Sequence, residues 1–206
     1  FHLEKAIWLA QNGRPGPSWI DIPLDVQAAD VVPDFQVGFN PESAGLVEKY
    51  DEQQLEAKVS ETLEMLFQSN SPIILGGNGI RLSKAEQSFL SLCRKLNIPV
   101  LTTWKALDII PEDDPLFIGR PGAVGQRYAN LAQQKSDWLL MLGARMDTGQ
   151  TAYMHQNLAR DAKKIMVDID EQEINKMDTN IDVPISSDAS DFIDEMLKQL
   201  EILEIG

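Results

Sequence analysis

Apolar residues recur along most of this chain at spacings that distinguish helices from strands. Between residues 52 and 67, Leu55, Val59, Leu63 and Leu66 stand three or four positions apart, which predicts an amphipathic helix. Short apolar runs follow at 73–75, 98–101, 138–142, 165–169 and 183–185, with helical or mixed stretches between them, and a closing helix is predicted over 191–203. Strands that alternate with helices form parallel sheets. The pattern therefore predicts an α/β fold, a Rossmann-like parallel sheet flanked by helices on both faces.

The first 50 residues differ from the rest. Residues 2–11 predict a short helix that Gly13 ends, and Trp19 to Ile22 predict a strand that Pro23 ends. These elements are too small to bury their own apolar faces. Residues 28–50 mix prolines and glycines with isolated apolar residues, which is the composition of a linker. We therefore expect a domain boundary there, with the main domain at 51–206.

Composition narrows the class of protein. The 206 residues suffice for one domain with a sizeable core, or for one domain with part of a neighbour. No apolar run approaches the roughly 18 residues of a membrane span, so a membrane protein is not expected. The net charge of −14 repels phosphate backbones, which argues against nucleic acid as a partner. Phe1 in place of an initiator methionine predicts a piece of a longer chain.

Cysteine and histidine are too scarce for several kinds of site. The single cysteine, Cys93, stands at helical spacing among apolar residues and is predicted to be a small core residue. One cysteine excludes a disulfide framework and a cysteine metal site. With only His2 and His155, a histidine zinc site or a Ser-His-Asp triad lacks its residues. The lack of disulfides predicts a cytoplasmic location.

The loops that follow the strands are the candidate ligand site, because open parallel sheets bind ligands beyond the carboxyl ends of their strands. Gly76, Gly77 and Asn78 begin a glycine-rich turn before a helix expected to start near Leu82. Such a turn presents backbone N–H groups to a diphosphate, or it is only a tight strand-to-helix connection. The dinucleotide pattern GxGxxG is not met, because Leu82 stands at its third glycine.

Two further loops carry hydroxyl and cationic side chains. Thr102, Thr103 and Trp104 follow a predicted strand, so the hydroxyls can bond to ribose or phosphate, or Thr103 can cap a helix. Gly119, Arg120 and Gly122 form a flexible cationic segment. Arg120 is the counter-ion expected for a diphosphate, although a solvated arginine in a surface turn fits the same sequence.

The last two loops carry acids. Gly143, Arg145 and Asp147 follow a fully apolar strand, where a charge is costly unless something pairs with it. Arg145 and Asp147 are therefore either an internal ion pair or half of a ligand site, and we favour the ligand site. Asp168, followed by Ile169, is predicted to accept hydrogen bonds from ribose hydroxyls, whereas Asp170 and Glu173 are predicted as helix-start acids.

Five segments resemble, in order, successive motifs of the thiamine-diphosphate-dependent enzymes of the acetolactate synthase type. Residues 14–27 resemble the end of the N-terminal pyrimidine-binding domain, and residues 73–80, 97–122, 136–147 and 163–176 resemble the central domain. The resemblance implies that 1–27 is the remnant of the pyrimidine-binding domain, 28–50 a linker and 51–206 the central domain.

The resemblance implies a parent enzyme that uses thiamine diphosphate and Mg²⁺ to decarboxylate and join 2-oxo acids. In that family the activating glutamate lies early in the N-terminal domain, and the metal motif beginning Gly-Asp-Gly lies in the C-terminal domain. This chain contains no Gly-Asp-Gly, so we expect no catalysis from it alone. The expected partners are the remaining domains of the parent and further copies of it in a homo-oligomer.

In acetolactate synthases the central domain also holds FAD as a structural cofactor. The positions carried over by the resemblance are Gly76, Gly77, Asn78, Thr102, Thr103, Trp104, Gly119, Gly122, Gly143, Arg145, Asp147, Asp168 and Ile169. Two motifs depart from the family. This chain has GRPG where the family has Gly-Met-His-Gly, and it has RMDTG where the family has Arg-Phe-Asp-Asp-Arg, so Gly149 replaces an arginine. FAD, an ADP-type nucleotide and no ligand all stay open. The competing interpretation is a self-contained nucleotide-binding module or a scaffold without ligand.

Overall fold

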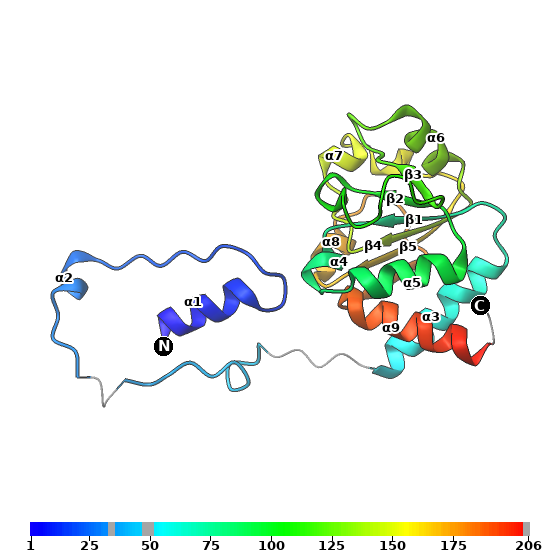
Figure 1. The fold of residues 1–206 in the computed structure, drawn as a ribbon. Coiled ribbons are helices and arrows are strands. Elements are labelled where there is room, and N and C mark those ends of the chain that lie inside the picture. The colour runs from blue at the N-terminus through cyan, green and yellow to red at the C-terminus, as the bar shows by residue number, and fades with distance from the viewer. Residues whose placement is uncertain (33–35, 47–51, 204–206) are drawn as a thin grey trace. The chain divides into compact units, whose positions relative to one another are not determined.

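The chain divides into two compact units, residues 1–50 and 51–206, here called the N-terminal unit and the α/β unit (Figure 1). The computed structural model describes residues 1–32, 36–46 and 52–203. No helix within these ranges is both long and apolar enough to cross a membrane.

The N-terminal unit contains helix α1 (His2–Gln11), as expected, and the short helix α2 (Leu24–Gln27). The Glu4 carboxylate accepts a hydrogen bond from the Phe39 N–H at 2.6 Å, and the Trp8 and Phe39 rings meet edge to face with centroids 5.9 Å apart. None of the described residues between 1 and 46 is buried, and Trp19 is 92% exposed. This unit therefore leaves its apolar side chains uncovered, as its small elements led us to expect.

The strand expected at Trp19 to Ile22 is wrong. These residues have no regular structure, and Pro23 stands at the N-cap of α2. A strand needs a hydrogen-bonded neighbour, and the described residues of the N-terminal unit provide none. The apolar pattern is therefore compatible with a strand whose partners the described residues do not supply.

The α/β unit is built on a six-stranded sheet in which every neighbouring pair is parallel, with the order β3-β2-β1-β4-β5-β6. The strands are β1 (Pro72–Gly76), β2 (Val100–Thr102), β3 (Phe117–Gly119), β4 (Trp138–Leu142), β5 (Lys163–Asp168) and β6 (Val183–Ser186). The predicted parallel α/β fold is confirmed, and each of the five expected strands is present. Strand β3 was not predicted.

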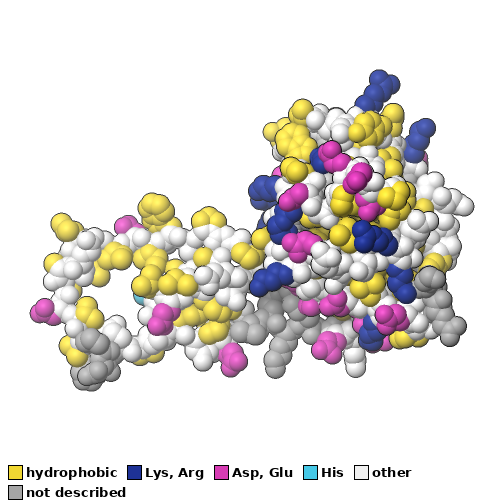
Figure 2. All heavy atoms as spheres, viewed as in Figure 1, with side chains coloured by type: hydrophobic (Ala, Val, Ile, Leu, Met, Phe, Trp, Pro, Cys, Tyr) yellow, Lys and Arg dark blue, Asp and Glu magenta, His cyan; other side chains and the backbone are white. Residues whose placement is uncertain are grey.

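Helices cover both faces of this sheet (Figure 1). One face packs against α3 (Glu52–Phe67), α5 (Glu86–Leu96) and α9 (Ala189–Ile202), around Phe89, Trp138 and Phe192. The other packs against α6 (Arg127–Lys135) and α8 (Glu171–Asn175), around Leu139, Met141 and Met166. Because both faces are covered, all five residues of β4 are buried. Charged side chains of both signs intermix on the outer surface (Figure 2).

Asp137 links the amino ends of the two central strands, β1 and β4, by hydrogen bonds. The Asp137 carboxylate, just before β4, accepts hydrogen bonds from the N–H groups of Asn70 at 2.7 Å and Ser71 at 2.9 Å, which lead into β1. Burial alone would raise the pKa of Asp137, but these N–H donors hold it below its ordinary value. The β1–β4 pair at the centre of the sheet is thus held in register from its amino end.

Candidate functional site

The strand order reverses between β1 and β4, and sheets of this order bind ligands at the carboxyl ends of the strands beside that point. We call the loops after β1 to β5 the carboxyl edge. It comprises residues 76–79, 102–104, 119–122, 143–147 and 168–169, which include all the residues predicted for a ligand.

The loops after β1 and β4 contact one another through their backbones. The Gly77 N–H donates to the Leu142 carbonyl and the Gly79 N–H donates to the Gly143 carbonyl, each at 2.9 Å. A Cβ on Gly77 would lie 2.1 Å from the Gly143 oxygen, so only glycine permits the approach. The amides of Gly77 and Gly79 are therefore used within the chain, and this favours the tight-turn interpretation of the glycine-rich loop.

Helix α4 (Gly79–Leu82) begins at Gly79, so the expected start near Leu82 is wrong. Its Arg81 donates from Nη1 to Asn78 Oδ1 at 3.1 Å and to the Lys105 carbonyl at 2.9 Å, and it also pairs with Asp108. Arg81 thus ties the loop after β1 to the loop after β2. No sequence pattern indicated this role of Arg81, because only the fold brings Lys105 and Asp108, 24 and 27 residues away, to its side.

The loop after β2 holds an unsatisfied hydroxyl. Thr102 is fully buried, and its Oγ1 has no hydrogen-bond partner among the described residues. Thr103 stands at the N-cap of the 3-10 helix η2 (Trp104–Ala106), but its hydroxyl makes no capping bond. Trp104 is half exposed. Buried hydroxyls usually have a partner, so Thr102 is the residue of this loop that a ligand would satisfy.

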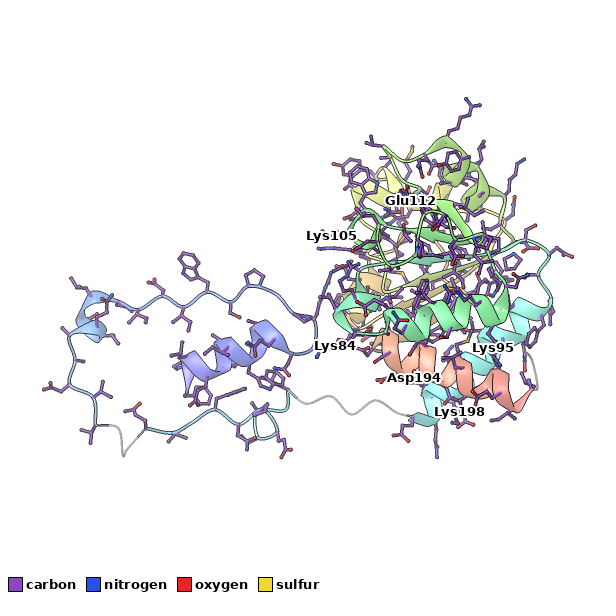
Figure 3. The ribbon with its side chains drawn as sticks, in the orientation of Figure 1. Lys84, Lys95, Lys105, Glu112, Asp194 and Lys198 are labelled. Carbon is purple, nitrogen blue, oxygen red and sulfur yellow. The ribbon has the colours of Figure 1, made fainter. Side chains whose placement is uncertain are left out.

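Arg120 is braced within the chain instead of being solvated. Its guanidinium pairs with Glu112 at 2.8 Å, donates to the Leu107 carbonyl at 3.1 Å and lies over the Phe117 ring, 5.1 Å from the centroid. The Arg120 side chain is only 18% exposed. Figure 3 labels Glu112 and Lys105, both on the connection between β2 and β3. The solvated-turn interpretation is therefore wrong, and a diphosphate would have to displace Glu112.

The glycines after β3 also serve the chain itself. Gly119 and Gly122 have φ values of 145° and 131°, which side chains rarely adopt. The Gly122 N–H donates to Asn130 Oδ1 at 2.9 Å, and Asn130 Nδ2 donates back to the Gly122 carbonyl at 3.0 Å. The Ala123 N–H donates to the Gly149 carbonyl at 2.8 Å. These bonds tie the loop after β3 to α6 and to α7 (Thr148–Thr151).

Arg145 and Asp147, in the loop after β4, do not pair with each other but with other residues. Arg145, with its side chain 62% exposed, pairs with Glu173 on α8 at 3.3 Å. The Asp147 carboxylate instead caps α7, accepting from the Gly149 N–H at 2.9 Å and the Gln150 N–H at 3.3 Å. Glu173, expected only as a helix-start acid, is buried and also pairs with Lys176. Spacing along the sequence gave no signal for the Arg145–Glu173 pair.

Asp168 ends β5 and is buried, and its carboxylate accepts from the Asp170 N–H at 3.0 Å. Asp170 caps α8 by accepting from the Gln172 N–H at 3.0 Å, which confirms the expected helix-start acid. Ile169 lies between them and is partly buried.

A nucleotide diphosphate needs N–H and guanidinium donors at the edge that are free to bind its oxygens. The amides of Gly77 and Gly79 and the guanidinium groups of Arg120 and Arg145 have partners within the chain. In this arrangement they do not fit a diphosphate, and the assignment of the edge to a nucleotide stays a prediction. Across residues 1–32, 36–46 and 52–203 no group of three His, Cys, Asp or Glu could hold a metal ion.

Cys93 offers no nucleophile. Its thiol is buried in α5, as predicted, and burial raises its pKa further above the ordinary thiol value. The reactive thiolate form is therefore disfavoured, and Cys93 acts as a core residue.

Comparison with known proteins identifies similar chains. The family model described as "Thiamine pyrophosphate enzyme, central domain" matches residues 59–196, from α3 to α9. The chain is 35% identical, over 98% of its length, to the probable acetolactate synthase large subunit of Methanococcus aeolicus, of which it covers 33%. It is 32% identical over 95% of its length to the large subunit of Lactococcus lactis, again covering 33% of that protein. For acetolactate synthase 1 of Zea mays, identity is 36% over 84% of this chain and 26% of the relative. The chain thus spans between about a quarter and a third of the length of these relatives.

Proposed function

This chain belongs to the thiamine pyrophosphate enzyme central-domain family, and from that premise we propose that it is the joining domain of an acetolactate synthase-like enzyme. The parent would be a thiamine-diphosphate-dependent decarboxylase or carboligase of 2-oxo acids. The observation that carries the proposal is the match of nearly the whole chain to a third of several acetolactate synthase large subunits. A central domain of this size would hold two catalytic domains at a fixed separation.

The N-terminal unit supports the domain assignment. Trp19, Ile22 and Leu24 expose large apolar side chains, which a complete domain would bury. We propose that residues 1–27 complete a pyrimidine-binding domain, that 28–50 is a linker and that 51–206 is the central domain. The other domains of the parent are then the partners that cover these side chains.

Catalysis is proposed to reside in those other domains. Thiamine diphosphate and Mg²⁺ would be bound there, because this chain carries no Gly-Asp-Gly motif. The central domain would contribute a rigid core, since its sheet is covered on both faces and fastened at both ends of the β1–β4 pair. We also propose a cytoplasmic parent that assembles as a homo-oligomer.

A nucleotide-binding module is the second candidate function. The buried Thr102 hydroxyl without a described partner and the half-exposed Trp104 ring favour it, because a hydroxyl and an indole suit a nucleoside. The donors expected for the diphosphate oppose it, because they are engaged within the chain.

A domain exchange tests the joining role. Residues 59–196 would replace the corresponding stretch of the Lactococcus lactis large subunit, and acetolactate formation would be assayed with thiamine diphosphate and Mg²⁺. We expect the chimera to be active and the present chain alone to be inactive. An inactive chimera that still assembles like the unmodified subunit would argue against the joining role, and product from the chain alone would contradict it outright.

A further inference from the structure

The chain contains two Asn-Gly pairs, Asn12–Gly13 and Asn78–Gly79. An asparagine before glycine is prone to spontaneous deamidation, because the glycine nitrogen has no neighbouring side chain to hinder its attack on the asparagine side chain. The same chemistry is thus available at two positions. Their surroundings differ in hydrogen bonding, in backbone conformation and in the space around the glycine.

Asn78–Gly79 is constrained by two hydrogen bonds and by its backbone conformation. The Gly79 N–H, which must turn toward the Asn78 side chain to react, donates to the Gly143 carbonyl at 2.9 Å. Asn78 Oδ1 accepts from Arg81 Nη1 at 3.1 Å. Asn78 has φ −68° and ψ −15° and leads directly into α4. Reaction there requires the loops after β1 and β4 to separate first.

Asn12–Gly13 has far fewer constraints. Asn12 is the extended C-cap residue of α1, and its side-chain Nδ2 donates to the Trp8 carbonyl at 2.8 Å. Apart from Gly13 itself and its two chain neighbours, no atom lies within 4 Å of the position where Gly13 would carry a Cβ. Within the described ranges the Gly13 N–H makes no backbone hydrogen bond. The nitrogen of Gly13 is therefore free to rotate toward Asn12.

We propose that Asn12 is a spontaneous deamidation site and that the contact between the β1 and β4 loops keeps Asn78 unreactive. In the reaction the Gly13 nitrogen bonds to Asn12 Cγ, the Cγ–Nδ2 bond breaks, and Nδ2 leaves as ammonia with the proton from Gly13. Water then opens the cyclic imide at either carbonyl, which gives aspartate or isoaspartate. The step needs water alone and involves no oxidant or reductant.

Deamidation of Asn12 would weaken the C-terminal end of α1. A carboxylate at position 12 cannot donate to the Trp8 carbonyl, and its negative charge at the C-terminus of α1 opposes the helix dipole. The last turn of α1 then frays. At position 78 isoaspartate would instead lengthen the backbone beside Gly79, where even an added Cβ would lie 2.7 Å from Gly143 Cα.

The test uses the whole chain, with each pair as the reference for the other. Samples are incubated at mildly alkaline pH in native buffer and in concentrated urea, and aspartate and isoaspartate at both positions are quantified by peptide mapping with mass spectrometry. In native buffer we expect Asn78 to convert at least about tenfold more slowly than Asn12, which corresponds to an opening free energy above about 1.4 kcal/mol. In urea the two rates should become similar. Equal native rates, or an Asn12 that converts only in urea, would overturn the proposal.

Two variants test the protecting contact. Gly143→Ala places a Cβ 2.8 Å from Gly79 Cα and should raise the native Asn78 rate toward its rate in urea. Arg81→Gln removes the bond to Asn78 Oδ1 without adding atoms to the loops and should raise the rate less. Asn12→Gln, whose longer side chain forms this imide poorly, should abolish the signal at position 12 only. An unchanged Asn78 rate in both folded loop variants would refute the protecting role of the contact.

Discussion

The backbone N–H of Gly79 donates to the carbonyl oxygen of Gly143 at 2.9 Å, so the loops after the two central strands are bonded to each other. These loops meet where the strand order reverses, which is where sheets of this order bind ligands. The N–H groups that would cradle a diphosphate are thus spent on holding the domain together. A domain whose central loops are bonded to each other in this way suits the proposed role of joining catalytic domains.

Replacing Gly77 by alanine should destabilise the α/β unit strongly. The added Cβ would lie 2.1 Å from the Gly143 oxygen, and because that neighbour is backbone it cannot move aside cheaply. We expect a loss of about 3 kcal/mol in the free energy of unfolding, measured by urea denaturation. The matched control is Gly149→Ala, whose nearest contact is a side-chain oxygen at 3.1 Å, and it should change stability by less than about 1 kcal/mol. Similar losses in both variants would contradict the backbone contact.

Asp137→Asn should cost about 1–3 kcal/mol at neutral pH, because the amide accepts less strongly from the N–H groups of Asn70 and Ser71. The pKa of Asp137 is lowered in the folded state, so its contribution is complete above the unfolded value of about 3.9. As the pH falls through the folded pKa, the contribution disappears. Denaturation at a series of pH values should therefore show the two proteins converging in acid, and a constant difference would count against this assignment.

Lys164→Met should stabilise the domain at neutral pH. The Lys164 side chain is buried on β5, where its amine donates to the Ala162 carbonyl at 3.2 Å. Burial lowers the pKa of this amine, although Asp182 and Asp161 oppose the shift. Its charge therefore costs stability, and the variant should gain about 1 kcal/mol.

The stability gained by Lys164→Met should decrease as the pH rises. The unfolded chain binds the Lys164 proton more tightly than the folded one, so the stability of the unmodified protein rises as the pH approaches about 10.4. The advantage of the variant should shrink over the same range. Lys163→Met, which removes an amine that is 61% exposed on the same strand, is the control for the loss of a lysine at neutral pH and should not stabilise the domain. An advantage for Lys164→Met that grows with pH would refute the interpretation.

Arg120 and Arg145 should differ in their importance for stability. Arg120→Met removes an ion pair, a bond to a carbonyl and a ring contact from a side chain that is only 18% exposed, so we expect a loss of about 1–2 kcal/mol. Arg145→Met removes an exposed ion pair and should cost less than about 1 kcal/mol, because Glu173 keeps Lys176. Thermal unfolding of both variants decides the order, and the reverse order would show that Arg120 does not brace the edge.

Periodicity predicted the fold because buried strands such as β4 are apolar throughout and amphipathic helices such as α3 repeat regularly. Strand β3 escaped prediction because it has three residues at the edge of the sheet, two of them only partly buried. Strand β5 starts two residues before the predicted run. Its first two residues, Lys163 and Lys164, are charged, so the apolar pattern did not include them. These errors lie where tertiary pairing, and not local pattern, decides the structure.

For the candidate site, the sequence predicted which loops form the carboxyl edge, but it did not predict the hydrogen bonds and ion pairs between them. The positions of the loops after β1, β2, β4 and β5 follow from the apolar runs, whereas the loop after β3 was identified from its glycines and Arg120. The partners of Arg120, Arg145 and Asp147 depend on which loops the sheet order brings together. That order, with β1 beside β4, is not encoded in the spacing of any single motif.

Isothermal titration calorimetry of the chain with ADP, FAD and thiamine diphosphate tests the central claim most directly. Because the amides of Gly77 and Gly79 and the guanidinium of Arg120 are engaged within the chain, we predict no binding tighter than about 1 mM, or about 4 kcal/mol, for any of the three. Tight binding of ADP or FAD that is lost on Arg145→Ala or Asp168→Ala would show that the edge is a nucleotide site. Tight binding of thiamine diphosphate would contradict the assignment of that cofactor to other domains.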